Sequence, residues 1–369
     1  MATATQFETE QTAARRDAFI ERLFQSALGA FDIFTIHLGD RLGFYEVLSA
    51  DGPLTSAELA ARTGTHERYA REWLEQQAMA GILDVKETTG GNGARRFCLP
   101  SGHEEVLAQR DSLNYLAPLA QIVAGAVRPI DALLTAFRTG GGVPFAAYGA
   151  DVREGQARIN RAAFLYQLGK EWLPAIPDVH SRMLGVSPPR VADVGCGAGW
   201  SSIGIALHYP NVRVDGFDLD GPSIELARAN AGQYAIGERV RFFVRDAGDP
   251  GLAGQYDLVT AFECIHDMSN PVGALRAMRR LAKDDGTVLV VDERVGEEFQ
   301  PGASVVERLM YGFSVLHCLP SGMADQPSAA TGAAMRPSTL RRYAMEAGFR
   351  DVEILPIDNF LFRFYRLLP

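Results

Sequence analysis

The sequence predicts a two-part protein in which a mainly helical N-terminal region precedes a seven-stranded α/β domain. Up to about residue 185, apolar residues recur at helical spacing. From Arg190 onward, short apolar strands alternate with amphipathic helices, a pattern typical of a largely parallel sheet. The length of 369 residues also suits two domains better than one. We expect an N-terminal domain over 1–100, a helical connector that contributes to a substrate pocket over 101–185, and an α/β domain over 186–369.

The first predicted helical region, residues 17–50, carries two apolar stripes. One includes Phe19, Leu23 and Leu28, and the other begins near Phe31. Apolar surface on this scale usually needs a partner, and a second copy of the chain is the simplest one. The sequence therefore predicts a dimer formed through the N-terminal helices.

A winged helix-turn-helix is expected next. Thr55 followed by Glu58 has the spacing of a capping box at a helix start. A second helix is expected from His66 to Met79, and two short strands, 82–85 and 96–99, then flank a glycine-rich turn. Helix, turn, helix and hairpin in this order are typical of the winged-helix motif.

The α/β domain should contain seven strands. We expect them at 190–194, 212–217, 240–244, 256–262, 286–291, 352–356 and 361–367. The last two are separated by too few residues for a helical crossover, so they should form an antiparallel hairpin.

A glycine-rich turn follows the first of these strands. Gly195, Gly197 and Gly199 would let the backbone approach a ligand closely. A dinucleotide fingerprint would place its third glycine at position 200, where this chain has Trp200. Asp193, just before the loop, would sit poorly beside a pyrophosphate but well beside an ammonium group. S-adenosylmethionine (AdoMet) carries an ammonium and a sulfonium, and no phosphate.

Three further strand ends support the same ligand. Asp218 lies about 20 residues past Gly199, the spacing of an acid that binds ribose hydroxyls. Asp246 follows the third strand, where it could meet the adenine, and Phe262 ends the fourth. Open α/β sheets bind ligands at the carboxyl ends of their strands. The expected cofactor-binding residues are Asp193, Gly195, Gly197, Gly199, Asp218, Leu219, Asp246, Ala247 and Phe262.

Residues 190–292 resemble, motif by motif, the core of the class I AdoMet-dependent methyltransferases, a Rossmann-like domain. With the winged helix, the whole chain resembles the two-domain, dimeric small-molecule methyltransferases of bacteria and plants. The stretch 262–269 is similar to the motif that contains the general-base histidine of plant-type O-methyltransferases. The tail, with His317 and Cys318, looks more like a mycobacterial-type branch of poorly defined substrate. The resemblance implies methyl transfer from AdoMet, leaving S-adenosylhomocysteine.

The resemblance makes His266 the expected catalytic base and places at Asp292 the acid that orients it. A histidine pKa of about 6.5 suits a base at neutral pH. The competing interpretation is that His266 caps the helix beginning near Asn270 or simply packs. Most of the seven histidines must be structural.

The expected substrate-pocket residues are Trp172, Met310, Tyr311 and His317, for which core packing is the alternative. We expect no metal ion. A metal at His266, Asp267 and His317 is the alternative, because the resemblance extends to C-methyltransferases of α-keto acids that place a metal at a histidine pair.

The expected activity is methylation of a small molecule at a hydroxyl oxygen, with carbon or nitrogen as alternatives. An AdoMet-sensing winged-helix regulator is a further alternative. However, the chain has a net charge of −9, and residues 1–100 hold 10 basic against 14 acidic residues. Nucleic-acid binding usually requires a basic surface, so no nucleic-acid partner is expected. Four scattered cysteines, no signal peptide and no long apolar run predict a cytoplasmic protein without a membrane partner.

Overall fold

The structure is a computed structural model that describes residues 2–86, 95–246, 250–302 and 304–369. The chain divides into two compact units, Met1–Ala124 and Gly125–Pro369. This boundary falls within the predicted connector 101–185. No single described helix is long and apolar enough to cross a membrane, although Ala117–Ala126 and Ile130–Thr139 meet that test as a bent pair.

The N-terminal unit has the winged-helix architecture predicted from its sequence. Its elements are α1 (Ala2–Arg41), α2 (Phe44–Asp51), α3 (Ser56–Thr63), α4 (Glu67–Met79), β1 (Asp84–Lys86), β2 (Arg96–Cys98), α5 (Ser101–Leu107) and most of α6 (Ala117–Ala126). The Thr55 hydroxyl accepts a hydrogen bond from the Glu58 amide, and the Glu58 carboxylate accepts one from the Thr55 amide, so the predicted capping box is present. β1 and β2 pair antiparallel. The predicted turn at 90–93 lies outside the described residues.

Helix α1 is longer than predicted and runs unbroken over 40 residues. Its C-terminal part is fixed to α4, because the Trp73 indole donates to the Thr35 carbonyl at 2.8 Å. Gly39 allows this close approach, since a Cβ there would lie 2.3 Å from the Trp73 ring. Along the rest of the helix the large apolar side chains are exposed, as at Phe24, which is 63% exposed.

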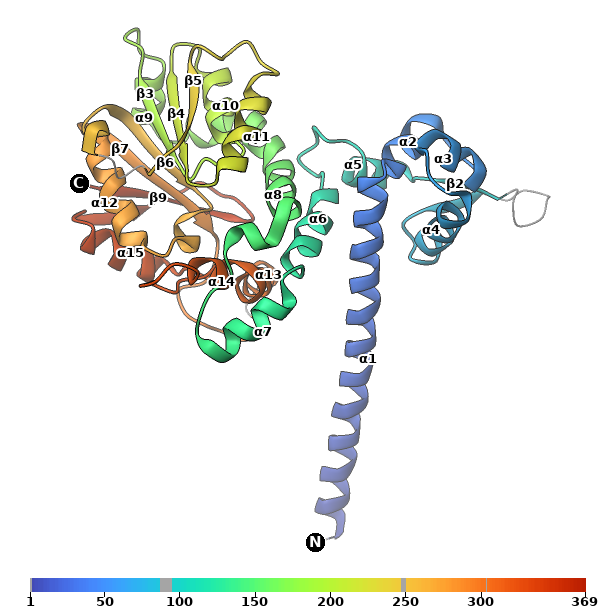
Figure 1. Ribbon diagram of the computed structural model, residues 1–369. Coiled ribbons are helices and arrows are strands. Elements are labelled where there is room, and N and C mark those ends of the chain that lie inside the picture. Colours follow the sequence, from blue (N-terminus) through green and yellow to red (C-terminus); the bar gives the residue numbers. More distant parts are fainter. Residues whose placement is uncertain (1, 87–94, 247–249, 303) are drawn as a thin grey trace. The chain divides into compact units, whose positions relative to one another are not determined.

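The C-terminal unit contains one seven-stranded sheet in the order β5-β4-β3-β6-β7-β9-β8 (Figure 1). The strands are β3 (Arg190–Val194), β4 (Arg213–Asp218), β5 (Val240–Val244), β6 (Tyr256–Phe262), β7 (Ala282–Glu293), β8 (Asp351–Ile354) and β9 (Phe362–Leu368). The five strands from β5 to β7 are parallel, and β9 pairs antiparallel with both β7 and β8. The predicted strands and the terminal hairpin are confirmed.

Helices cover both faces of this sheet. The structure places α7 (Ile130–Thr139), η2 (Phe145–Tyr148), α8 (Gly149–Ala163), η3 (Phe164–Trp172), α9 (Pro177–Met183), α10 (Trp200–His208), α11 (Gly221–Ala231), η4 (Pro250–Leu252), η5 (Ile265–Asp267), α12 (Pro271–Leu281), α13 (Val305–Phe313), η6 (Ser314–Cys318), α14 (Leu319–Gly322) and α15 (Pro337–Glu346) in chain order. Residues of η3, α10 and α11 fill one apolar core and residues of α12 and α15 the other. Because helices cover both faces of the sheet, the loops that follow the parallel strands lie at the carboxyl ends of those strands.

Candidate functional site

The glycine loop joins β3 to α10 with three residues in the left-handed region, Gly195 (φ 69°), Gly197 (φ 50°) and Gly199 (φ 79°). A Cβ at Gly195 would lie 2.7 Å from the Cys264 sulfur, and one at Gly199 would lie 2.6 Å from the Phe242 ring. These two glycines are therefore required by packing within the protein. A Cβ at Gly197 would meet nothing within 4 Å, so the loop faces open space at this residue, where a ligand could approach its backbone.

Asp218, at the end of β4, holds the loop in this shape. Its carboxylate accepts hydrogen bonds from the amides of Gly197 and Asp220, both at 2.9 Å. Burial raises the pKa of Asp218, although the backbone hydrogen bonds oppose the shift. Two bonds leave lone pairs free on a carboxylate, so Asp218 can also accept from a ligand beside Gly197.

Other predicted cofactor residues lie at neighbouring strand ends. Leu219 follows Asp218 and is 74% exposed, and Asp246 is exposed just beyond β5. Phe262 ends β6 and packs edge-on against Phe164, with ring centroids 5.2 Å apart. Ala247 lies outside the described residues.

Asp193 occupies a different environment from the one predicted. Its carboxylate is only 1% exposed and accepts hydrogen bonds from the hydroxyls of Ser201 and Ser202 at 2.6 Å and from Thr260 at 3.0 Å. Burial raises its pKa, and the three hydroxyls partly offset this. The expectation of a carboxylate open to an ammonium group is therefore corrected, because hydroxyls from α10 and β6 surround it.

His266 lies in η5, directly after β6, and is 2% exposed. Its Nδ1 lies 2.7 Å from Asp292 Oδ1 and 3.0 Å from Glu293 Oε2, and its Nε2 lies 3.1 Å from Asp267 Oδ1. The pairing with Asp292 agrees with the role expected for that acid. The alternative that His266 caps the next helix is not supported, because Asn270 caps α12 through the Gly273 amide.

The charge state of His266 also differs from expectation. Burial lowers the pKa of the imidazole, but the charges of Asp292, Glu293 and Asp267 outweigh burial and raise it well above its ordinary value. These carboxylates therefore favour the imidazolium form of the ring, and the pKa of His266 lies above the ordinary value of about 6.5 that was expected.

Several buried polar atoms around His266 have no hydrogen-bond partner among the described residues. They are Tyr148 Oη, Asp292 Oδ2 and His317 Nε2, whereas Asp267 Oδ1 and Glu293 Oε2 face the ring nitrogens of His266. Buried polar atoms without partners are costly. The cluster can therefore gain substantially by binding a polar substrate group or a cation.

The predicted pocket residues separate into two groups. His317 belongs with the His266 cluster, since its ring packs edge-on against Tyr148 at 4.5 Å between centroids, and burial lowers its pKa. Trp172 instead lies in the core against Phe364. Met310 packs in a smaller apolar cluster. The Tyr311 hydroxyl accepts a hydrogen bond from Arg336. For Trp172 and Met310 the core-packing alternative fits the structure. The sequence alone could not decide this, because it does not show which face of each helix is turned inward.

Glu263 was not predicted as a site residue, although it lies within the motif around His266. It has a positive φ of 52°, and its carboxylate accepts hydrogen bonds from Gln156 and Asn160 of α8 at 2.9 and 2.8 Å. Its place at the end of a parallel strand was a usable signal. Its positive φ could not be predicted from the sequence, because few glutamates adopt this backbone conformation.

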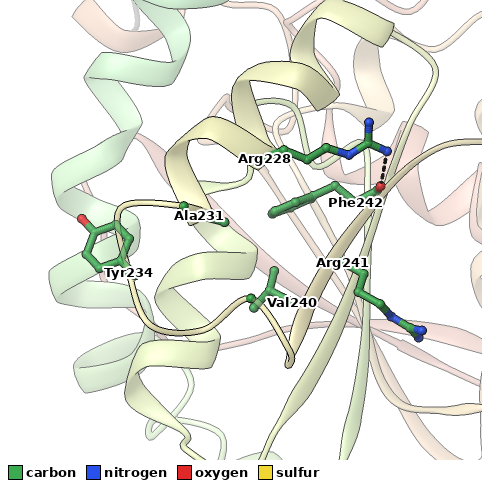
Figure 2. Close-up of a pocket in the computed structure, with 8 residues that line it drawn as sticks. Arg228, Ala231, Tyr234, Val240, Arg241 and Phe242 are labelled. Carbon is green, nitrogen blue, oxygen red and sulfur yellow. Dashed lines mark hydrogen bonds between the residues drawn. The ribbon is translucent and has the colours of Figure 1, made fainter.

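A separate pocket of about 350 Å³ lies between α11 and the first residues of β5 (Figure 2). Its lining includes Tyr234, Val240 and Phe242, and Arg228 donates to the Phe242 carbonyl at 2.7 Å. None of the predicted site residues lines it, although the Phe242 ring in its wall also packs against Gly199 of the glycine loop.

Comparison with known proteins matches residues 192–288 to a family described as a methyltransferase domain and residues 30–109 to the Rv2258c-like winged HTH domain. A ubiquinone biosynthesis O-methyltransferase of Aromatoleum aromaticum is 28% identical over 176 residues, covering 47% of this chain and 69% of the relative. An ajmaline N-methyltransferase of Rauvolfia serpentina is 29% identical over 105 residues, covering 28% and 36% of the two chains.

Solved structures match over nearly the whole chain. Human N-acetylserotonin methyltransferase in complex with SAM has a TM-score of 0.70 at 19% identity, covering 95% of this chain and 97% of the other. A mitomycin 7-O-methyltransferase has a TM-score of 0.69 at 21% identity, covering 96% and 99%. The domain matches and the shared fold agree with the sequence and the sheet topology. The chain therefore contains a methyltransferase domain and an N-terminal winged-helix domain, and it shares the fold of two-domain AdoMet-dependent methyltransferases.

Proposed function

We propose that the protein transfers a methyl group from AdoMet to a hydroxyl oxygen of a small molecule. One observation carries the proposal. The open side of the glycine loop and the His266–Asp292 pair lie at the carboxyl ends of strands that are neighbours in the sheet. The methyl donor and a proton acceptor can therefore meet at one edge of the sheet. The similarity to a ubiquinone biosynthesis O-methyltransferase and to the fold of a mitomycin 7-O-methyltransferase favours oxygen as the acceptor.

The residues at this edge fit AdoMet. Gly197 leaves room beside its backbone, and the Asp218 carboxylate next to it keeps lone pairs for ribose hydroxyls. Leu219 and Asp246 are exposed where the adenosine would lie, and Phe262 closes the end of β6. When bound, AdoMet supplies a methyl group on a sulfonium, which is open to in-line attack. Gly195, Gly199 and Asp193 hold the loop from within the protein.

For oxygen as the acceptor, a proton must leave the hydroxyl as the new bond forms. Asp292 binds the Nδ1 side of His266 and thereby leaves Nε2 as the nitrogen that can receive this proton. Asp267 now occupies Nε2, so the acceptor hydroxyl would have to replace that carboxylate. The ring must also lose its own proton first. The base therefore works in the neutral form, which becomes the major form above the raised pKa of His266.

Metal-assisted C-methylation of a keto acid is the second candidate, and one observation favours it. Donor atoms of His266, Asp267 and Cys318 lie within 4.8 Å of one another, a set that could hold a metal ion. Metal analysis of the purified protein distinguishes metal-assisted C-methylation from O-methylation with His266 as the base. One equivalent of a transition metal, together with loss of turnover in a chelator, would replace the oxygen proposal.

We further propose that two copies of the chain associate through α1 and that the protein acts in the cytoplasm without a nucleic-acid partner. On α4, the two arginines are already paired within the helix, Arg68 with Glu72 and Arg71 with Glu67. Little free positive charge is left there for phosphates. Salt-sensitive, sequence-selective DNA binding in a gel-shift experiment would contradict this part of the proposal.

The activity is tested by incubating the protein with AdoMet and a panel of phenols, aliphatic alcohols, amines and keto acids. Mass spectrometry detects the methylated product and S-adenosylhomocysteine together. The proposal expects products among the alcohols or phenols. Products only among the amines or keto acids would contradict it.

A further inference from the structure

Glu263 has a backbone conformation that turns its side chain out of the strand pattern. Its amide still donates to the Val291 carbonyl at 2.8 Å, so the pairing of β6 with β7 continues through this residue. Successive side chains of a strand normally point to opposite faces of a sheet. Here Phe262 packs against Phe164, and Glu263 also reaches the helix that leads directly into Phe164. Strained residues of this kind concentrate at functional sites.

The hydrogen bonds that the Glu263 carboxylate accepts from described side chains come from two neutral amides. Gln156 and Asn160 donate one amide hydrogen bond to each of its two oxygens, at 2.9 and 2.8 Å. These bonds fix its position without neutralising its charge. The pKa of Glu263 is raised to about 7. Burial is the largest cause and the charge of Asp292 adds to it, whereas the charge of His266 opposes the shift.

The surroundings of Glu263 are short of positive charge. Among the described residues, the charge of His266 acts on four carboxyl groups, those of Glu263, Asp267, Asp292 and Glu293. His317 also acts on Asp267, but burial lowers the pKa of His317. Asp292 Oδ2 has no hydrogen-bond partner among the described residues. A cationic group on a ligand would be stabilised strongly at such a place.

Helix α8 holds this carboxylate near the glycine loop. Arg153 of α8 donates to Asp220, beyond the end of β4, at 2.6 Å, while Gln156 and Asn160 bind Glu263, beyond the end of β6. In the sheet, β3 lies between β4 and β6, so α8 crosses the carboxyl end of β3, where the glycine loop begins. The residue after Glu263 contacts the loop directly, at Gly195.

We infer that Glu263 is the anionic anchor for the α-ammonium group of the methyl donor, held in place by α8. This inference rests on the proposed use of AdoMet. It transfers to Glu263 the role that the sequence suggested for Asp193, whose oxygens are taken by three hydroxyls. The anchor acts on the amino-acid end of the donor, so a ligand that lacks this end should not depend on Glu263.

Calorimetry on the full chain tests this with two ligands and three variants. S-adenosylhomocysteine keeps the ammonium group, and 5′-methylthioadenosine lacks the whole amino-acid end. Glu263→Gln keeps the size and an acceptor oxygen but removes the charge. We expect it to bind S-adenosylhomocysteine about ten- to a hundredfold more weakly, as for loss of a charge-assisted hydrogen bond, and to bind 5′-methylthioadenosine as the wild type does. Glu353→Gln removes the same charge from an exposed site on β8 and should change neither affinity.

Asn160→Ala is the third variant, and it tests the role of α8 while leaving the carboxylate in place. It should weaken S-adenosylhomocysteine binding less than Glu263→Gln does, again without affecting 5′-methylthioadenosine. It also provides the readout if Glu263→Gln does not fold. Equal weakening of both ligands, or unchanged affinity for S-adenosylhomocysteine, would overturn the inference about Glu263. Failure of the wild-type protein to bind any of these adenosine ligands would overturn the proposed function as well.

Discussion

Asp218 is the residue that most directly holds the glycine loop, the proposed cofactor site, in its shape. It ties the Gly197 amide to the end of β4 and remains able to accept ribose hydroxyls. Asp218→Ala should weaken AdoMet binding about ten- to a hundredfold, because hydrogen bonds to a charged group contribute roughly 1.5–3 kcal/mol. Calorimetry measures the change, with Asp284→Ala at an exposed position as the matched control. Equal affinity in both variants would remove Asp218 from the site.

His266 is expected to affect turnover and leave cofactor binding unchanged. His266→Ala should keep the wild-type affinity for AdoMet and lose about a hundred- to ten-thousandfold in turnover, the usual contribution of a general base. Single-turnover assays at saturating AdoMet measure this. Turnover within a few-fold of the wild type would show that the acceptor needs no base, as an amine would.

The carboxylates around His266 also set the direction of the pH dependence. They raise the pKa of the ring well above its ordinary value, so the neutral form that can accept a proton grows as pH rises. The turnover of the wild-type protein should therefore increase from neutral to alkaline pH, measured at saturating concentrations of both substrates. The same shift makes any stabilisation by the bound proton greatest at low pH and lost as pH rises through the raised pKa. A rate independent of pH over this range would argue against His266 as the base.

At the residue scale, the sequence indicated which residues stand at the strand ends better than it indicated the burial and hydrogen-bond partners of their side chains. The glycines, Asp218 and the His266–Asp292 pair were predictable because each stands at a strand end or in a known motif. The burial of Asp193 was not, since one of its partners is Thr260, on another strand. Nor was the orientation of Glu263, which follows from a single positive φ.

At the scale of elements, the order of strands and helices was predictable because alternation and helical periodicity are local properties of the sequence. The inward faces of the helices between 101 and 185 were not predictable, and Trp172 shows the consequence. Its aromatic ring suits either a pocket or a core, and only the packing against β9 distinguishes them.

Glu58 connects two elements of the winged helix, since it completes the capping box of α3 and also pairs with Arg96 of β2. The backbone hydrogen bond from Thr55, followed by that from Arg96, lowers the pKa of Glu58 to about 2. Its contribution to stability is therefore complete above the ordinary glutamate pKa of about 4.3 and is lost as pH falls toward 2. Glu58→Gln should lower the melting temperature at pH 7 by more than at pH 3. An equal decrease at both pH values would show that the charge of Glu58 does not stabilise the fold.

At the scale of the whole molecule, α1 exposes an apolar face that a single chain leaves to solvent. Its large exposed side chains are Phe19, Ile20, Leu23, Phe24, Leu28, Phe31, Phe34 and Leu38. A patch of this kind is typical of an interface. The wild-type protein should be a dimer by light scattering, and Phe24→Asp should weaken the dimer by placing a charge on that face. Gln25→Glu adds a charge on the same helix at an exposed polar residue that bonds to Glu21, and it should leave the dimer intact. A monomeric wild type would contradict the expected use of α1.

The binding of AdoMet and of its demethylated product is the measurement that tests the central claim most directly. Titration of the purified protein with each ligand by calorimetry should give saturable binding of one molecule per chain, with dissociation constants in the micromolar range. Absence of heat and of any thermal stabilisation with both ligands would contradict the assignment of the glycine loop as an AdoMet site.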